Sequence, residues 1–155
     1  MPKEIERKFL LKNDNWRRAV VSKTRLVQGY FISTGGPGIR VRIAGDAGFL
    51  TIKGELKNFT RSEFEYRIPA AEAEAMLREF CGTRLVEKYR YLVRVGKHVW
   101  EVDEYLGLNS GLYTAEIELA SEEEEFERPD WLGKEVSLDR RYGNGSLAQK
   151  PFTKW

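Results

Sequence analysis

Two carboxylates and an ammonium group alternate along the stretch EIERKFL, residues 4–10. In a β-strand, side chains point alternately to opposite faces, so Glu4, Glu6 and Lys8 would share one face. Carboxylates two positions apart on one strand repel each other unless a cation lies between them. Hard divalent ions such as Mg²⁺ or Mn²⁺ prefer carboxylate oxygens and keep water ligands for a phosphate-bearing substrate. The spacing therefore indicates a metal site for phosphate chemistry, and the alternative is a solvent-exposed face.

The same alternation of charged and apolar residues recurs in six later segments, residues 38–45, 49–54, 63–68, 87–95, 99–105 and 115–120. One face of these strands carries full charges and almost no neutral polar side chains. Its members are Glu4, Glu6, Lys8, Arg40, Arg42, Lys53, Glu63, Glu65, Lys88, Arg90, Glu101, Asp103, Glu116 and Glu118. The basic members would face the oxygens of a substrate, and arginine offers paired donors that match phosphate geometry.

About eight strands are expected when the stretch around residues 28–32 is included. Helical patterns cover residues 69–82 and 121–128, a short helix is expected within 13–20, and another is expected in the tail from Ser137. Helices should pack on the apolar face of the sheet. The charged face then lines either a hydrated interior or, in an open sheet, bulk solvent.

The composition fits a single domain over residues 1–155 and excludes several classes of function. The net charge is only +2 although 32% of residues are charged, so no overall field favours nucleic acid or a membrane. One cysteine, Cys81, excludes an internal disulfide, and one histidine, His98, excludes a zinc site built from Cys and His. The sequence has no run of 18 apolar residues, and its first residues lack the apolar segment that a signal peptide contains. A soluble, cytoplasmic protein is expected.

The pattern ExExK at Glu4, Glu6 and Lys8 resembles the signature of the CYTH superfamily, the triphosphate tunnel metalloenzymes. The segments QGYF, IRVR, LTIKG, RSEFEY, VEKYRY, WEVDEY and AEIEL follow in the order found in that family, so the resemblance covers most of the chain. It implies an α+β fold, an eight-stranded antiparallel β-barrel with flanking helices. The barrel forms a tunnel with a charged interior, in which a linear triphosphate binds with Mg²⁺ or Mn²⁺ and is hydrolysed or cyclised.

The resemblance also implies roles for individual residues. The metal ligands would be Glu4, Glu6, Asp103, Glu116 and Glu118. Residues that hold the triphosphate would be Lys8, Arg40, Arg42, Lys53, Lys88 and Arg90. Residues that either bind the metal or support its ligands would be Glu63, Glu65 and Glu101.

Two further side chains are candidates for catalysis. Tyr30, in QGYF, matches a family tyrosine near the reacting end and would accept a proton or position a group, unless it is only an amphipathic wall residue. Lys88 would assist the departing phosphate, because it shares the inward face with Arg90. The ending DRRYGN resembles the family's ending and leaves two lysines, Lys134 and Lys150, as candidates to enter the tunnel.

The expected reaction is metal-dependent hydrolysis of inorganic tripolyphosphate, because the short chain shows no evident aromatic clamp for an organic base. A thiamine triphosphatase and a class IV-type adenylate cyclase stay open within the same fold. A non-catalytic polyphosphate-binding module is the alternative of another class, although it would not need the acidic set. Nucleic-acid binding is disfavoured because basic residues alternate with acids, and a homodimer stays open.

Overall fold

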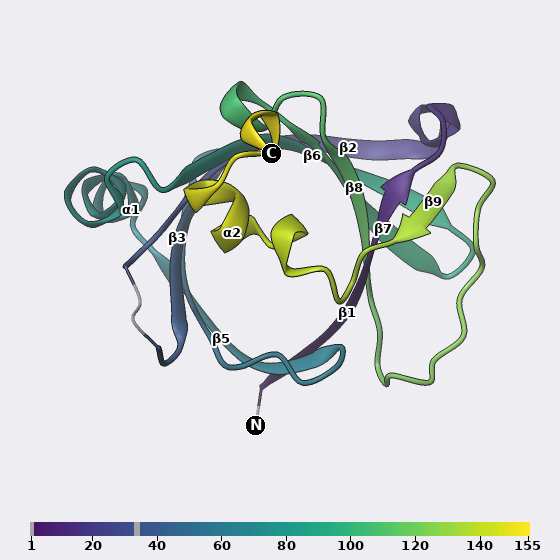
Figure 1. Cartoon of the computed structure of the whole chain (residues 1–155), viewed down its shortest axis with the longest axis horizontal. Helices are drawn as coiled ribbons and strands as arrows, with labels where there is room; N and C mark the ends of the chain where they lie inside the picture. Colours follow the sequence, from purple (N-terminus) through teal and green to yellow (C-terminus); the bar gives the residue numbers. More distant parts are fainter. Residues whose placement is uncertain (1, 33–34) are drawn as a thin grey trace.

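The computed structural model describes residues 2–32 and 35–155, and its main feature is a closed antiparallel β-barrel (Figure 1). Eight strands are hydrogen-bonded in the order β5-β4-β3-β2-β6-β7-β8-β1, and pairing between β5 and β1 closes the ring. These strands are β1 (Lys3–Leu11), β2 (Val20–Tyr30), β3 (Gly38–Ala44), β4 (Ala47–Lys53), β5 (Thr60–Ile68), β6 (Leu85–Val95), β7 (His98–Tyr105) and β8 (Tyr113–Glu118). A ninth strand, β9 (Leu132–Glu135), pairs with the end of β1 and was not predicted.

The alternation in the sequence is realised as an outer apolar face and an inner polar face. The largest apolar cluster lies outside the barrel and consists of Phe9, Trp16, Tyr91, Val93, Val95, Trp100, Val102, Ala115, Ile117, Leu119, Trp131 and Leu132. Burying this surface supplies the main driving force for folding, at roughly 25 cal/mol per Å² of apolar area. The charged residues of the same strands are thereby directed inward.

Helices cover only part of the outer face. The predicted helix at 69–82 is present as α1 (Ala70–Met76), which continues into the π-helical turn η2 (Leu77–Cys81) and packs on β3 and β4. The short helix expected within 13–20 is the 3₁₀ helix η1 (Asn15–Ala19), which inserts Trp16 into the outer cluster.

The prediction of a helix over residues 121–128 is wrong, because this acidic segment is irregular. Its carboxylates bind donors elsewhere instead of capping a helix. Glu122 accepts hydrogen bonds from Asn58, the backbone of Phe59 and Thr60. Phe126 packs against the outer cluster, so the loop that leads to β9 takes the place of a covering helix.

The C-terminal tail turns into the barrel, as the yellow segment within the ring of strands shows (Figure 1). It contains η4 (Arg140–Tyr142), the predicted tail helix α2 (Asn144–Gln149) and η5 (Phe152–Lys154). From α2, Leu147 and Ala148 pack against Val86, Tyr105 and Leu112. The interior is therefore apolar at this end, and the charged residues lie beyond it.

The 3₁₀ helix η3 (Gly107–Asn109) links β7 to β8. Within residues 2–32 and 35–155, no helix is long and apolar enough to cross a membrane.

Candidate active site

A cavity of about 700 Å³ lies inside the barrel and collects most of the predicted site residues. The predicted residues in its lining are Glu4, Glu6, Lys8, Tyr30, Arg40, Arg42, Lys53, Glu63, Glu65, Arg90, Glu101, Glu116 and Glu118. Residues 136–146 of the tail, apart from Arg141, complete the lining. Two predicted residues, Lys88 and Asp103, lie in the barrel wall without lining the cavity, and both are fully buried.

Three carboxylates, Glu6, Glu101 and Glu116, lie close enough to hold one metal ion: one oxygen from each lies within 4.8 Å of the others. Strand register brings them together, because Glu101 lies opposite Glu116 on β7 and β8, and β8 pairs with β1. Of the predicted ligands, Glu4, Asp103 and Glu118 do not belong to this group. Glu101, which the sequence placed only among metal ligands or their supports, does belong to it.

The electrostatics of the three carboxylates suit a cation. Burial, and then the neighbouring carboxylates of Glu116 and Glu4, raise the pKa of Glu6 well above its usual value. Burial also opposes ionisation of Glu116, but the charges of Lys8 and Arg90 outweigh it and hold the pKa of Glu116 well below normal. Among the described residues, the buried Oε1 of Glu116 has no hydrogen-bond partner. This oxygen lies 3.7 Å from Lys8 and 3.9 Å from Arg90, too far for a hydrogen bond, so it can still bind a metal ion.

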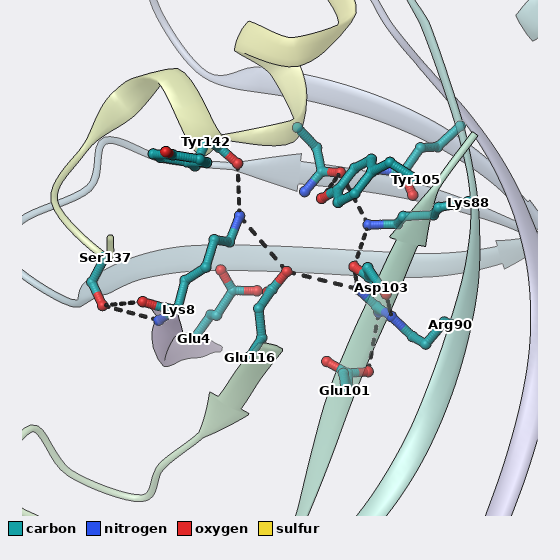
Figure 2. A network of polar contacts seen from close by, with 12 residues as sticks. Glu4, Lys8, Lys88, Arg90, Glu101, Asp103, Tyr105, Glu116, Ser137 and Tyr142 are labelled. Carbon is teal, nitrogen blue, oxygen red and sulfur yellow. Dashed lines mark hydrogen bonds and ion pairs between the residues drawn. The ribbon is translucent and has the colours of Figure 1, made fainter. Parts of the chain in front are cut away.

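Asp103 lies outside the group of three carboxylates, because on β8 it is opposite Thr114, whereas Glu101 is opposite Glu116. Its carboxylate accepts two hydrogen bonds of 2.9 Å from Arg90 and one of 2.7 Å from Lys88 (Figure 2). Burial raises the pKa of Asp103, but the two cations outweigh burial and lower it. This geometry makes Asp103 the counter-ion of the buried Lys88 and of Arg90, which lines the cavity.

Lys88 is enclosed between Asp103 and the tail. Its Nζ donates to Oδ1 of Asn144 at 3.0 Å, and the same oxygen accepts the hydroxyl of Tyr105 at 3.0 Å. Burial lowers the pKa of Lys88 to about 7; the Asp103 charge opposes this shift, and the charges of Arg90 and Arg42 add to it. Lys88 is thus bonded to a residue of the cavity lining, Asn144, without lining the cavity itself.

The depressed pKa of Lys88 predicts that stability rises with pH above neutrality. Between about pH 7 and the ~10.4 of a free lysine, the unfolded chain binds a proton that the folded chain releases. The free energy of unfolding therefore increases across this window, and the unfavourable contribution of Lys88 is fully present below pH 7. Urea denaturation at about pH 7 and about pH 9.5 measures this change. The free energy of unfolding should increase more between the two pH values in the wild type than in Lys88→Met. An equal increase in the free energy of unfolding of both proteins would contradict the expectation.

Glu4, which also lines the cavity, forms ion pairs with two basic side chains. Its oxygens lie 3.0 Å from Lys53 Nζ and 3.0 Å from Arg61 Nε. Burial raises the pKa of Glu4, yet a hydrogen bond with Glu63 and the charges of Lys53 and Arg61 lower it to about 2. Sequence reasoning missed Arg61, although its spacing of two from Glu63 places it on the same face of β5.

Two arginines that line the cavity, Arg40 and Arg42, have a single anionic partner between them within the described residues, Glu65, which pairs with Arg40. Burial, together with the charges of Arg40 and Arg90, lowers the pKa of Arg42 to about 10. Arg40 donates to Thr51 and Glu65 through Nη2, but its buried Nε has no hydrogen-bond partner in the described part of the chain. Cations that repel one another and retain unused donors are suited to bind an anion with several oxygens.

The tail is tied to the cavity by polar contacts. Lys8 Nζ donates to the backbone oxygen of Tyr142 at 3.0 Å, and it lies 3.7 Å from Glu116 (Figure 2). Asn144 was missed in the sequence, although it lies in the quoted segment DRRYGN. Neither of the candidate lysines, Lys134 and Lys150, lines the cavity, and both are exposed.

The chain belongs to the CYTH domain family, whose model matches residues 2–150. The inorganic triphosphatase of Acetivibrio thermocellus is 41% identical over 152 residues, which cover 98% of this chain and 97% of that protein. The inorganic triphosphatase of Nitrosomonas europaea is 37% identical over 151 residues, 94% of this chain and 96% of that protein. A crystal structure of the inorganic triphosphatase NE1496 matches with a TM-score of 0.67 and 35% identity, over 96% of this chain and 95% of that one.

Membership of this family implies a divalent metal ion. The residues present fit such an ion, since the group of Glu6, Glu101 and Glu116 offers three carboxylates and an oxygen without a hydrogen bond. Carboxylate oxygens without nitrogen or sulfur ligands are typical of sites for hard divalent cations.

Proposed function

We propose that this protein hydrolyses the terminal phosphoanhydride bond of inorganic tripolyphosphate with the help of Mg²⁺ or Mn²⁺. One observation carries the proposal. The three carboxylates suited to a metal ion, Glu6, Glu101 and Glu116, line the same cavity as Arg40 and Arg42, which are suited to bind phosphate. Arg90 lies beside these carboxylates, 3.0 Å from Glu101 and 3.9 Å from Glu116. Two relatives named inorganic triphosphatase, aligned over almost the whole chain, support the choice of substrate.

The metal, when bound, would polarise a phosphoryl oxygen and lower the pKa of an attacking water. We propose that Glu6, Glu101 and Glu116 hold it. The residues proposed to bind the triphosphate are Lys8, Arg40, Arg42, Lys53, Arg61 and Arg90. Because phosphoryl transfer depends mainly on positioning and charge neutralisation, this arrangement of fixed cations would supply most of the rate acceleration.

The remaining carboxylates of the cavity would keep these cations in place. Glu4 and Glu63 both contact Lys53, and Glu65 contacts Arg40. Glu118 lies exposed at the cavity lining and opposite Glu6, where it is a candidate ligand for a further ion. Asp103 is proposed to fix Arg90 and Lys88, and Lys88 would assist the departing phosphate only after Asn144 has moved.

Organic triphosphates are the competing substrates. Trp16 could stack on an organic base only if its ring faced the cavity, but it is fully buried outside the barrel, where its ring packs on Tyr91. Trp16 therefore cannot stack on the base of thiamine triphosphate or ATP, and it gives no support to an organic substrate.

Phosphate release from tripolyphosphate, thiamine triphosphate and ATP, each with Mg²⁺ and with Mn²⁺, tests the proposal. We expect the largest kcat/KM for tripolyphosphate and no turnover in the presence of a chelator. A larger kcat/KM for thiamine triphosphate or ATP would overturn the choice of substrate. Binding of tripolyphosphate without metal-dependent turnover would indicate a polyphosphate-binding module.

A cytoplasmic location is a further part of the proposal, which leaves the choice between a monomer and a homodimer open. Cys81 is buried and free, as is usual for proteins of a reducing compartment. Gel filtration with light scattering would decide between a monomer and a dimer.

A further inference from the structure

Gln28 links two residues of the cavity although it was not predicted to belong to the site. Its side chain is fully buried, on the same inward face of β2 as Tyr30 and directly opposite Arg42 on β3. Gln28 Nε2 lies 2.6 Å from the hydroxyl of Tyr30, and Gln28 Oε1 lies 2.9 Å from Nε of Arg42. A buried amide with both ends bound has a defined orientation.

The chemistry of the partners fixes which end of the amide faces which residue. A guanidinium group has donors only, so the Gln28 atom that faces Arg42 must be the oxygen. The amide nitrogen then faces Tyr30 and donates to its hydroxyl oxygen. Tyr30 is therefore an acceptor in this contact, and its own proton must point elsewhere.

Both partners of Gln28 keep donors for the cavity. Tyr30 and Arg42 line it, and among residues 2–32 and 35–155 the Tyr30 hydroxyl donates to no protein acceptor. Arg42 uses its Nε for Gln28, and within the same residues its two terminal nitrogens make no hydrogen bond. The buried amide of Gln28 thus orients two residues of the cavity lining. Tyr30 keeps its hydroxyl proton, and Arg42 keeps two guanidinium nitrogens, for a ligand in the cavity.

We infer that Gln28 is a positioning residue that holds Tyr30 as a hydrogen-bond donor, and Arg42 as a paired donor, to the oxygens of the bound triphosphate. The inference rests on the proposed function and deepens it, because it assigns Tyr30 a donating role in place of proton abstraction. A tyrosine that accepts from a buried amide and donates to phosphate stabilises negative charge during the reaction.

Gln28→Glu tests the inference with almost no change of shape. The carboxylate introduced at position 28 still accepts from Arg42 but has no N–H, so the Tyr30 hydroxyl must turn and donate to that carboxylate. We expect kcat for tripolyphosphate to fall about 10- to 100-fold, the effect of one hydrogen bond to a charged group. Gln149→Glu, at the other glutamine of the chain, makes the same chemical change on the exposed side of α2 and should leave kcat unchanged.

A double-variant comparison separates the direction of the hydrogen bond from the added charge. Tyr30→Phe alone should lower kcat by a similar factor, and Gln28→Glu should cause no further loss when Phe is present at position 30. If the two losses multiply, the negative charge itself is responsible and the inference is overturned. A wild-type kcat in Gln28→Glu would overturn it as well.

A measurement without substrate keeps the inference apart from the proposed function. In ¹⁵N–¹H NMR spectra of the metal-free chain, Tyr30→Phe should move the side-chain NH₂ signals of Gln28 upfield, because their acceptor is lost, and should leave those of Gln149 in place. Unmoved Gln28 signals would overturn the hydrogen-bond assignment. If the signals move while the wild type fails to hydrolyse tripolyphosphate, the arrangement stands and the proposed function fails.

Discussion

Glu116→Gln is expected to lower kcat for tripolyphosphate by about 100- to 1,000-fold, comparable to the loss of a main electrostatic contact in an active site. Glu116 is central to the proposed metal group, with Glu101 opposite it on β7 and Lys8 opposite it on β1. The amide keeps the shape of the side chain but removes the negative charge and one metal-binding oxygen.

Phosphate release at several metal concentrations measures this effect, and thermal unfolding provides a second readout. Ions that bind only the folded state raise the melting temperature, so Mg²⁺ or Mn²⁺ should stabilise the wild type and not Glu116→Gln. Glu74→Gln, on the exposed side of α1, is the matched control and should behave as the wild type. A variant at position 116 that retains both turnover and metal stabilisation would remove Glu116 from the metal site.

Asp103→Asn is expected to reduce the free energy of unfolding by about 3–5 kcal/mol. Asp103 and Lys88 are both fully buried, so the substitution leaves Lys88 without its counter-ion, and Arg90 keeps only its contacts with Glu101 and Glu116. Urea denaturation at one pH below 7, where Lys88 carries its charge, measures the loss. Asp46→Asn, in the exposed turn between β3 and β4, should change the same quantity by less than about 0.5 kcal/mol.

The same variant separates the two roles considered for Asp103. As a counter-ion, Asp103 contributes mainly to stability. As a metal ligand, it would instead contribute to metal affinity, and Asp103→Asn would raise the metal concentration needed for half-maximal activity with little loss of stability. That second result would restore Asp103 to the ligand set.

The barrel could be predicted from the sequence because a strand repeats every two residues. Alternation assigned Glu4, Glu6 and Lys8 to one face, and the closed sheet turns that face inward. The segments that failed have no such period: the acidic loop at 121–128 is held by contacts with distant residues, and β9 is only four residues long.

The details of the site were harder to predict, because they depend on strand register. Glu101 and Asp103 share a face of β7, and only the pairing with β8 decides that Glu101 meets Glu116 while Asp103 meets Thr114. Gln28 carried too weak a signal on its own, since a neutral amide becomes informative only when its partners are known. Arg61, by contrast, could have been found from its period of two with Glu63.

A crystal structure with Mn²⁺ and tripolyphosphate tests the central claim most directly, because manganese can be located by its anomalous scattering. We predict an anomalous peak within about 2.5 Å of carboxylate oxygens from Glu6, Glu101 and Glu116. We also predict phosphate oxygens in contact with the metal and with Arg42 and Arg90. Manganese outside the barrel, or tripolyphosphate bound away from these arginines, would contradict the account.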